Sequence, residues 1–130
     1  VLGNLTLIGI PFLTQEAYDR LLWACDLNFV RGEDSFVRAQ WAAKPLVWQI
    51  YPQHDAVHEA KLDAFITRYG AAALADLWRA WNGQGGLVDA WAAFAATLPD
   101  LTTHARRWAV AQSRLPDLAA NLVKFSQKPL

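Results

Sequence analysis

The chain has 130 residues, a length that fits one domain. Apolar residues make up 54% and charged residues 18%, a composition that forms a core and excludes a disordered chain. Twelve basic side chains balance twelve acidic ones, and this net charge of zero argues against a protein that binds duplex nucleic acid.

A single cysteine, Cys25, cannot form a disulfide within the chain, which indicates a reducing compartment. Its spacing from Leu21 and Leu22 places it on the apolar side of an expected helix, as a buried thiol. No uninterrupted apolar stretch reaches the ~18 residues of a membrane span, and the start of the chain lacks the pattern of a signal peptide. Because the sequence contains no methionine, we expect it to be part of a longer protein.

Three short apolar runs predict strands that are buried on both faces. They cover residues 5–8, 27–30 and 46–50. Amphipathic helices between such strands are typical of a parallel sheet with helices on both faces, so the fold class is expected to be α/β. Three strands make a thin sheet, and we expect further strands to precede Val1.

The helices of the first half are predicted from their ends. Thr14 is expected to cap the first helix. The second helix is expected to end at Lys44-Pro45, because the residue before a proline avoids helical angles. A longer helical pattern begins near Asp55.

Beyond residue 70 the strand patterns stop, and a helical tail is expected. Its helices are predicted over residues 71–81, 87–98, 103–113 and 116–125. Pro99 is expected to close the second of these helices, and Pro116 to lie in the first turn of the last. Tryptophans are expected to pack this tail: Trp78, Trp81, Trp91 and Trp108.

One segment, residues 29–36 (FVRGEDSF), combines several residue types that are suited to binding phosphate. It follows a predicted strand and opens a helix, at the sheet edge where open parallel sheets bind ligands. Gly32 permits a close backbone approach, and the amides of 34–36 are expected to be free at the positive end of the helix dipole. Ser35 adds a hydroxyl donor, and Arg31 can contact a phosphate with two hydrogen bonds.

Glu33 and Asp34 would be repelled by a diphosphate, so we expect them to face sugar hydroxyls or a cationic acceptor. Ordinary helix capping explains the same residues. In that interpretation Asp34 or Ser35 caps the helix, Glu33 interacts with the dipole, and Arg31 pairs with either acid. The spacing alone leaves both interpretations open.

Two further loops follow predicted strands and are expected at the same edge. Together they supply aromatic rings and amides, which suit the faces and edge of a nucleobase. These residues are Phe12, Gln15, Tyr18, Tyr51 and Gln53. Each also has a structural explanation: Phe12 can pack as a staple at a helix start, Tyr18 can belong to the core, and Tyr51 can belong to a turn.

Two histidines four residues apart, His54 and His58, could share a helix face, but no third ligand is fixed by the sequence. Solvated helix surface is the preferred explanation, and no metal is expected.

Residues 19–53 resemble the signature region of a known family, through DRLLWACDLNFVRGEDSFVRAQWAAKPLVWQIYPQ. The segments PFLTQEAYD at 11–19 and PDLAANLVKF at 116–125 are similar to the same family. It is the EarP family of bacterial protein-arginine rhamnosyltransferases, which modify elongation factor P. The resemblance covers essentially the whole chain.

The resemblance implies an inverting enzyme that transfers L-rhamnose from dTDP-β-L-rhamnose to an arginine of elongation factor P, in the cytoplasm and without a metal. It implies a two-domain glycosyltransferase of the GT-B type, whose C-terminal Rossmann-like domain binds the donor. Residues 1–70 would be part of that nucleotide-sugar region, and residues 71–130 a helical region packed on it. The N-terminal domain, which carries the candidate general base, would be absent from this chain.

The resemblance also implies roles for individual residues. Glu33 and Asp34 match the motif required for activity, and with Ser35 they match the donor site. The other implied donor contacts are Phe12, Gln15, Tyr18, Arg31, Gly32, Tyr51 and Gln53. Two alternatives stay open: a transferase that uses another nucleotide-sugar such as a UDP-sugar, and a non-catalytic α/β interaction domain.

Overall fold

Two short parallel strands lie at the centre of the structure. In the computed structural model, which describes residues 3–127, β1 (Asn28–Arg31) pairs with β2 (Leu46–Gln49). Asn28 lies opposite Leu46, and Arg31 lies opposite Gln49. Helix α2 (Glu33–Trp41) connects the two strands. The predicted order of strand, helix and strand is therefore confirmed over this part of the chain, and the carboxyl ends of both strands meet at one edge.

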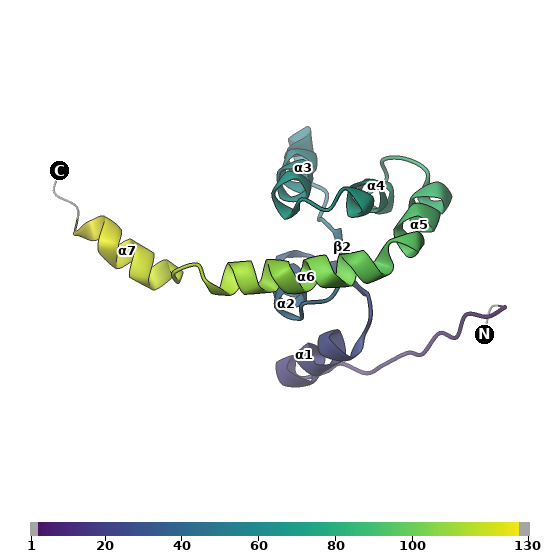
Figure 1. The fold of residues 1–130 in the computed structure, drawn as a ribbon, viewed down its shortest axis with the longest axis horizontal. Helices are drawn as coiled ribbons and strands as arrows, with labels where there is room; N and C mark the ends of the chain where they lie inside the picture. Colours follow the sequence, from purple (N-terminus) through teal and green to yellow (C-terminus); the bar gives the residue numbers. More distant parts are fainter. Residues whose placement is uncertain (1–2, 128–130) are drawn as a thin grey trace.

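The first predicted strand is wrong, because residues 5–8 are not part of the sheet. Leu5, Leu7 and Ile8 are 54%, 69% and 80% exposed. The segment leaves the body as an extended stretch (Figure 1). A buried strand needs a neighbouring strand and cover on both faces. A sheet of two four-residue strands offers this apolar run no interior to enter.

Helix α1 (Gln15–Ala24) begins where the sequence predicts. The Thr14 hydroxyl accepts a hydrogen bond from the Ala17 amide at 3.3 Å, which satisfies one of the free donors of the first turn. After the helix, the buried Asn28 side chain donates to the Leu22 carbonyl at 3.0 Å. This bond fixes the end of α1 against the start of β1.

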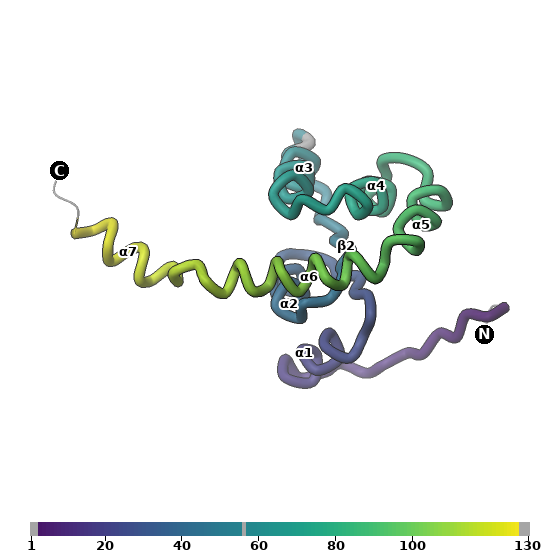
Figure 2. The backbone as a smooth tube through the Cα atoms, in the orientation of Figure 1, coloured from purple at the N-terminus to yellow at the C-terminus, as the bar shows by residue number. Residues whose placement is uncertain are grey.

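The remaining helices follow β2 in chain order. They are the 3-10 turn η1 (His54–Ala56), α3 (Val57–Tyr69), α4 (Ala72–Trp81), α5 (Leu87–Ala96), α6 (Leu98–Ser113) and α7 (Leu118–Ser126). Helix α6 crosses in front of α2, and α7 continues the chain away from the body (Figure 1, Figure 2). No side chain of α7 is buried.

Both proline predictions in this tail need correction. Pro99 does not close a helix: it lies in the first turn of α6, where a missing amide costs no hydrogen bond. Pro116 precedes α7 instead of entering it. The Asp117 carboxylate caps α7 by accepting from the Ala120 amide at 2.8 Å.

The core is an aromatic cluster between the sheet and the helices. Trp78 is 1% exposed, and its indole donates to the Leu46 carbonyl at 2.6 Å. Phe65 contacts the rings of Trp78 and Trp108. The expectation that tryptophans pack the tail is therefore confirmed for these two. Trp81 and Trp91 are 37% and 45% exposed and flank Phe29.

Within residues 3–127, no helix is both long enough and apolar enough to cross a membrane.

Candidate functional site

The turn from β1 into α2 is built around Gly32. This residue is the N-cap of α2, with φ 77°, in the left-handed region that favours glycine. Its amide donates to the Gln49 carbonyl at 3.3 Å, and its carbonyl accepts from the Trp48 indole at 3.0 Å. Two residues of β2 therefore fix the backbone that opens the helix.

Tyr51 lies directly against this glycine. A Cβ atom on Gly32 would lie 2.7 Å from the Tyr51 Cε2 atom, so a larger residue would require the ring to shift. The Arg31 guanidinium lies over the same ring, 4.9 Å from its centroid, as a cation–π contact. The structure thus brings together Arg31, Gly32 and Tyr51 from the ends of both strands, as the sequence predicts.

No side chain caps the start of α2. The interpretation in which Asp34 or Ser35 caps the helix is therefore wrong. The helix begins at Glu33, and the Gly32 amide is already paired. Asp34 and Ser35 lie in the first turn as predicted, and Glu33 joins them. The amides of these three residues have no acceptor within a helix that begins at Glu33. They provide donors at the positive end of the helix dipole.

The two acidic side chains of the motif point to different elements. Glu33 pairs with Lys61 of α3, with 3.2 Å between Oε1 and Nζ. Asp34 pairs with Arg38 one turn along α2, at 3.1 Å. Among the described residues, no ion pair joins Arg31 to either acid, so the predicted pairing of Arg31 with them is wrong.

Arg38 joins α2 to α1. Its Nη1 atom donates to both carboxylate oxygens of Asp19, at 3.0 and 2.9 Å. Its Nε atom donates to Asp34 at 3.1 Å. The side chains of Arg38 and Asp19 are 25% and 31% exposed. The hydrogen bond to Asp19, followed by the one to Asp34, raises the pKa of the guanidinium.

The residues proposed for the base lie at the start of α1. Phe12 is fully exposed, Gln15 is the first residue of the helix, and Tyr18 is half-buried against the core. Phe12 and Tyr18 line a hollow of about 340 Å³ together with Ile10, Pro11 and Leu13. Within residues 3–127, no ring contact joins Phe12 or Tyr18 to Tyr51. The structure thus describes two groups of predicted residues, one at each helix start.

The remaining predicted residues lie beside the second strand end. The backbone amide of Gln53 donates to the His58 Nδ1 atom at 3.1 Å. The Gln53 side chain is exposed, and the His58 side chain is partly exposed. No group of three or more His, Cys, Asp or Glu side chains in the described part of the chain could hold a metal ion. His54 and His58 therefore gain no third ligand there.

Three residues of these ion pairs are not among those predicted from the sequence, namely Asp19, Arg38 and Lys61. The spacing of Asp34 and Arg38, four residues apart on one helix, was a readable signal for the first ion pair. Asp19 and Lys61 lie 19 and 28 residues from their partners, and no local pattern announces such contacts.

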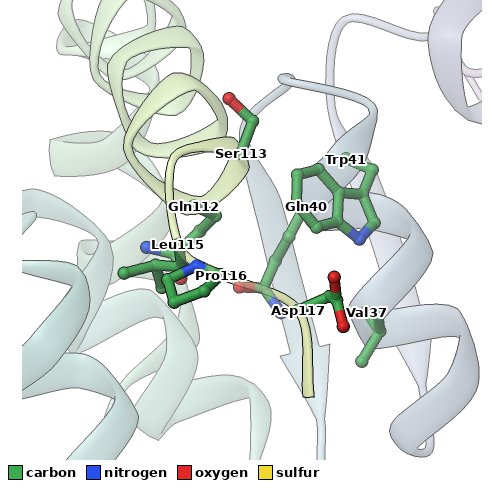
Figure 3. Close-up of a pocket in the computed structure, with 8 residues that line it drawn as sticks. All are labelled: Val37, Gln40, Trp41, Gln112, Ser113, Leu115, Pro116 and Asp117. Carbon is green, nitrogen blue, oxygen red and sulfur yellow. The ribbon is translucent and has the colours of Figure 1, made fainter. Parts of the chain in front are cut away.

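A separate pocket of about 410 Å³ lies between α2 and the junction of α6 with α7 (Figure 3). Trp41 and Gln40 line it from α2, and Asp117 and Pro116 line it from the junction. None of these residues belongs to the predicted site.

The fold and the candidate site together indicate the class of protein. The chain is an α/β protein with two parallel strands, and it places free helix amides, an arginine and an aromatic ring at the carboxyl edge of its sheet. That edge is where open parallel sheets bind ligands.

Comparison with known proteins then gives the family. The model of the family described as "Elongation-Factor P (EF-P) rhamnosyltransferase EarP" matches residues 1–127. The chain therefore belongs to the EarP family.

Two curated relatives are named protein-arginine rhamnosyltransferase. The one from Pseudomonas aeruginosa is 54% identical over 123 residues, which cover 89% of this chain and 33% of the relative. The one from Pseudomonas putida is 48% identical over 135 residues, which cover 98% of this chain and 36% of the relative. The chain thus spans about a third of the length of these enzymes.

A solved structure described as "Structural basis for EarP-mediated arginine glycosylation of translation elongation factor EF-P" has the same fold. Its TM-score is 0.76 at 46% identity, and the match covers 92% of this chain and 40% of that chain. The arrangement of helices around the two strands is therefore shared with a solved member of the family.

Proposed function

We propose that this chain is the donor-binding part of an inverting glycosyltransferase. The complete protein would move L-rhamnose from dTDP-β-L-rhamnose to an arginine of translation elongation factor P. Glu33 and Asp34 would be the residues required for activity. The free amides of the first turn of α2, with Ser35, would stabilise the charge that grows on the departing diphosphate.

The geometry of the β1–α2 junction carries this proposal. Gly32 holds the backbone so that no side chain covers the first-turn amides, and Tyr51 and Arg31 stand beside it. A diphosphate at the helix start would meet three amide donors and a guanidinium. The base would then extend toward Phe12, Gln15 and Tyr18 or rest on Tyr51, with Gln53 near its edge.

The same proposal assigns the parts of the chain. Residues 1–70 would belong to the Rossmann-like C-terminal domain of a GT-B enzyme, and residues 71–130 would form the helical region that packs on it. Catalysis would need the remaining two thirds of the protein, because inversion requires the acceptor opposite the leaving diphosphate, with reacting atoms about 3 Å apart. The reaction would proceed in the cytoplasm without a metal.

Calorimetric titration of the full-length protein tests the ligand class. We expect dTDP to bind more tightly than UDP or ADP. Equal binding of all three nucleotides would indicate a phosphate site without selection of the base. The absence of binding by a folded protein would overturn the proposal and favour a non-catalytic interaction domain.

Glu33 is tested separately in the full-length enzyme. Glu33→Ala should abolish rhamnose transfer and leave the fold in place, because the Glu33–Lys61 pair is half-exposed and contributes at most about 1 kcal/mol to stability. Lys61→Ala removes the same ion pair and serves as the matched control. Wild-type turnover in Glu33→Ala, measured as glycosylated elongation factor P, would contradict the assigned role.

A further inference from the structure

The strongest connection between the two groups of candidate site residues is the Arg38 side chain. The group at the start of α1 comprises Phe12, Gln15 and Tyr18, and the group at the start of α2 comprises Glu33, Asp34 and Ser35. Arg38 donates two hydrogen bonds to Asp19, which lies one residue after Tyr18. It donates a third to Asp34, inside the second group. We call Asp19, Arg38 and Asp34 the α1–α2 bridge.

We propose that Arg38 is a positioning residue that fixes the start of α1 at a set distance from the start of α2. The inference rests on the proposed function, and on its arrangement in which the diphosphate lies at the start of α2 and the base extends toward the start of α1. The bridge would make recognition of the base and recognition of the diphosphate depend on one another.

The geometry favours a rigid link over an incidental surface contact. The Arg38 side chain is 25% exposed, and its partners come from two helices. A planar guanidinium with three fixed acceptor contacts loses little further freedom, whereas a lysine could not reproduce the forked geometry. Its raised pKa follows from the same two carboxylates.

The bridge also accounts for the orientation of Asp34. This carboxylate is one residue from Glu33 but hydrogen-bonds along the helix to Arg38, away from the free amides. A carboxylate held in this way does not repel a diphosphate at the helix start as strongly as one that faces it. Asp34 therefore acts on the donor through Arg38, and Glu33 is left as the acid nearest the opening of the helix.

The test compares a ligand that spans both helix starts with a ligand that reaches only one. In the full-length protein, the affinities of dTDP and of inorganic pyrophosphate are measured for wild type, Arg38→Gln and Asp19→Asn. We expect both variants to lose about tenfold in dTDP affinity and little in pyrophosphate affinity, because only dTDP needs the fixed spacing. Arg38→Lys should recover part of the loss.

Arg20→Gln is the matched control, because within residues 3–127 the ion pair of Arg20 is with the exposed Glu16 of the same helix. It should leave both affinities unchanged. If Arg38→Gln fails to fold, Asp19→Asn still tests the inference, because the asparagine side chain has the same shape as the aspartate that it replaces.

The possible outcomes separate this inference from the proposed function. If wild type does not bind dTDP, the proposed function is wrong and the inference falls with it. If wild type binds dTDP selectively but Arg38→Gln and Asp19→Asn keep the wild-type ratio of the two affinities, the proposed function stands and the bridge has no positioning role. An equal loss for both ligands would likewise refute the inference.

Discussion

Gly32 is the residue on which the candidate site depends most. Its φ of 77° is strained for any other residue, and the Tyr51 ring occupies the space that a side chain would need. The same backbone is hydrogen-bonded to Gln49 and Trp48, so it cannot move without disturbing β2.

Gly32→Ala should therefore destabilise the protein by about 2 kcal/mol and displace Tyr51, with weaker binding of dTDP. Gly9→Ala is the control, because a Cβ atom there would meet nothing within 4 Å. Urea denaturation measures the first effect and calorimetry the second. Identical unfolding curves for Gly32→Ala and wild type would show that the turn is not constrained as described.

Tyr69 is a second residue with a testable signature. It is 3% exposed, and its hydroxyl has no partner among the described residues. Burial raises its pKa to about 12, from the usual 10. The phenol is neutral in the folded state while the unfolded chain ionises above pH 10, so stability is retained below pH 10 and lost as the pH rises toward 12.

The expected loss is about 1.4 kcal/mol per pH unit within that window. Tyr69→Phe should remove this part of the pH dependence, and at neutral pH it should change the free energy of unfolding by less than about 1 kcal/mol, since no hydrogen bond is broken. Unfolding by urea at pH 7 and pH 11 measures both effects. An undiminished loss of stability between these pH values in Tyr69→Phe would assign the titration to another group.

At the scale of the element, Asn82 attaches α4 to the end of β2. Its side-chain amide donates to the carbonyls of Trp48 and Trp78, each at 2.8 Å, and its oxygen accepts from the Ile50 amide at 3.0 Å. One side chain thus ends a helix and continues the hydrogen bonding of a strand, directly before Tyr51.

Asn82→Ala should lower stability by about 2 kcal/mol, because it leaves backbone groups at the strand end unpaired. Asn82→Asp keeps the acceptor for Ile50, but it loses both donated bonds and places a negative charge against two carbonyl oxygens at a helix C-terminus. We therefore expect it to destabilise at least as much as Asn82→Ala. The midpoints of thermal unfolding rank the stabilities of the three proteins. Equal midpoints for wild type and Asn82→Ala would show that Asn82 does not attach α4 to β2 as described.

The elements that the sequence predicts well are those with local signals. Thr14 caps α1 through its own hydroxyl, and the Pro45 boundary separates α2 from β2. The β1–α2 junction was recognisable because a glycine, two acids and a serine follow an apolar strand. The cap was not predicted, since Gly32 takes the place of the side-chain cap that Asp34 or Ser35 was expected to provide.

The errors come from interactions that no local pattern contains. Residues 5–8 have the composition of a buried strand, but burial depends on neighbours that the described part of the chain does not supply. Asp19 and Lys61 reach their partners across 19 and 28 residues, through the packing of helices. Long-range contacts of this kind follow from the tertiary arrangement alone.

At the scale of the whole molecule, the structure places its candidate residues near the starts of α1 and α2 and at the end of β2. Helix α7 and the segment before α1 both extend away from the body of the molecule (Figure 1). The exposed side chains of these two segments include Phe12, Ile8 and Phe125. The chain spans about a third of the length of its curated relatives, and apolar side chains are exposed in both of these segments.

The proposed function requires that the start of α2 binds the diphosphate of a thymidine nucleotide. An amide chemical-shift titration of the full-length protein with dTDP tests it most directly. We predict the largest shifts at Glu33, Asp34 and Ser35, with smaller ones near Tyr51 and Gln15. Shifts confined to the pocket between α2 and the α6–α7 junction, or the absence of shifts at these three amides under saturating dTDP, would contradict the claim.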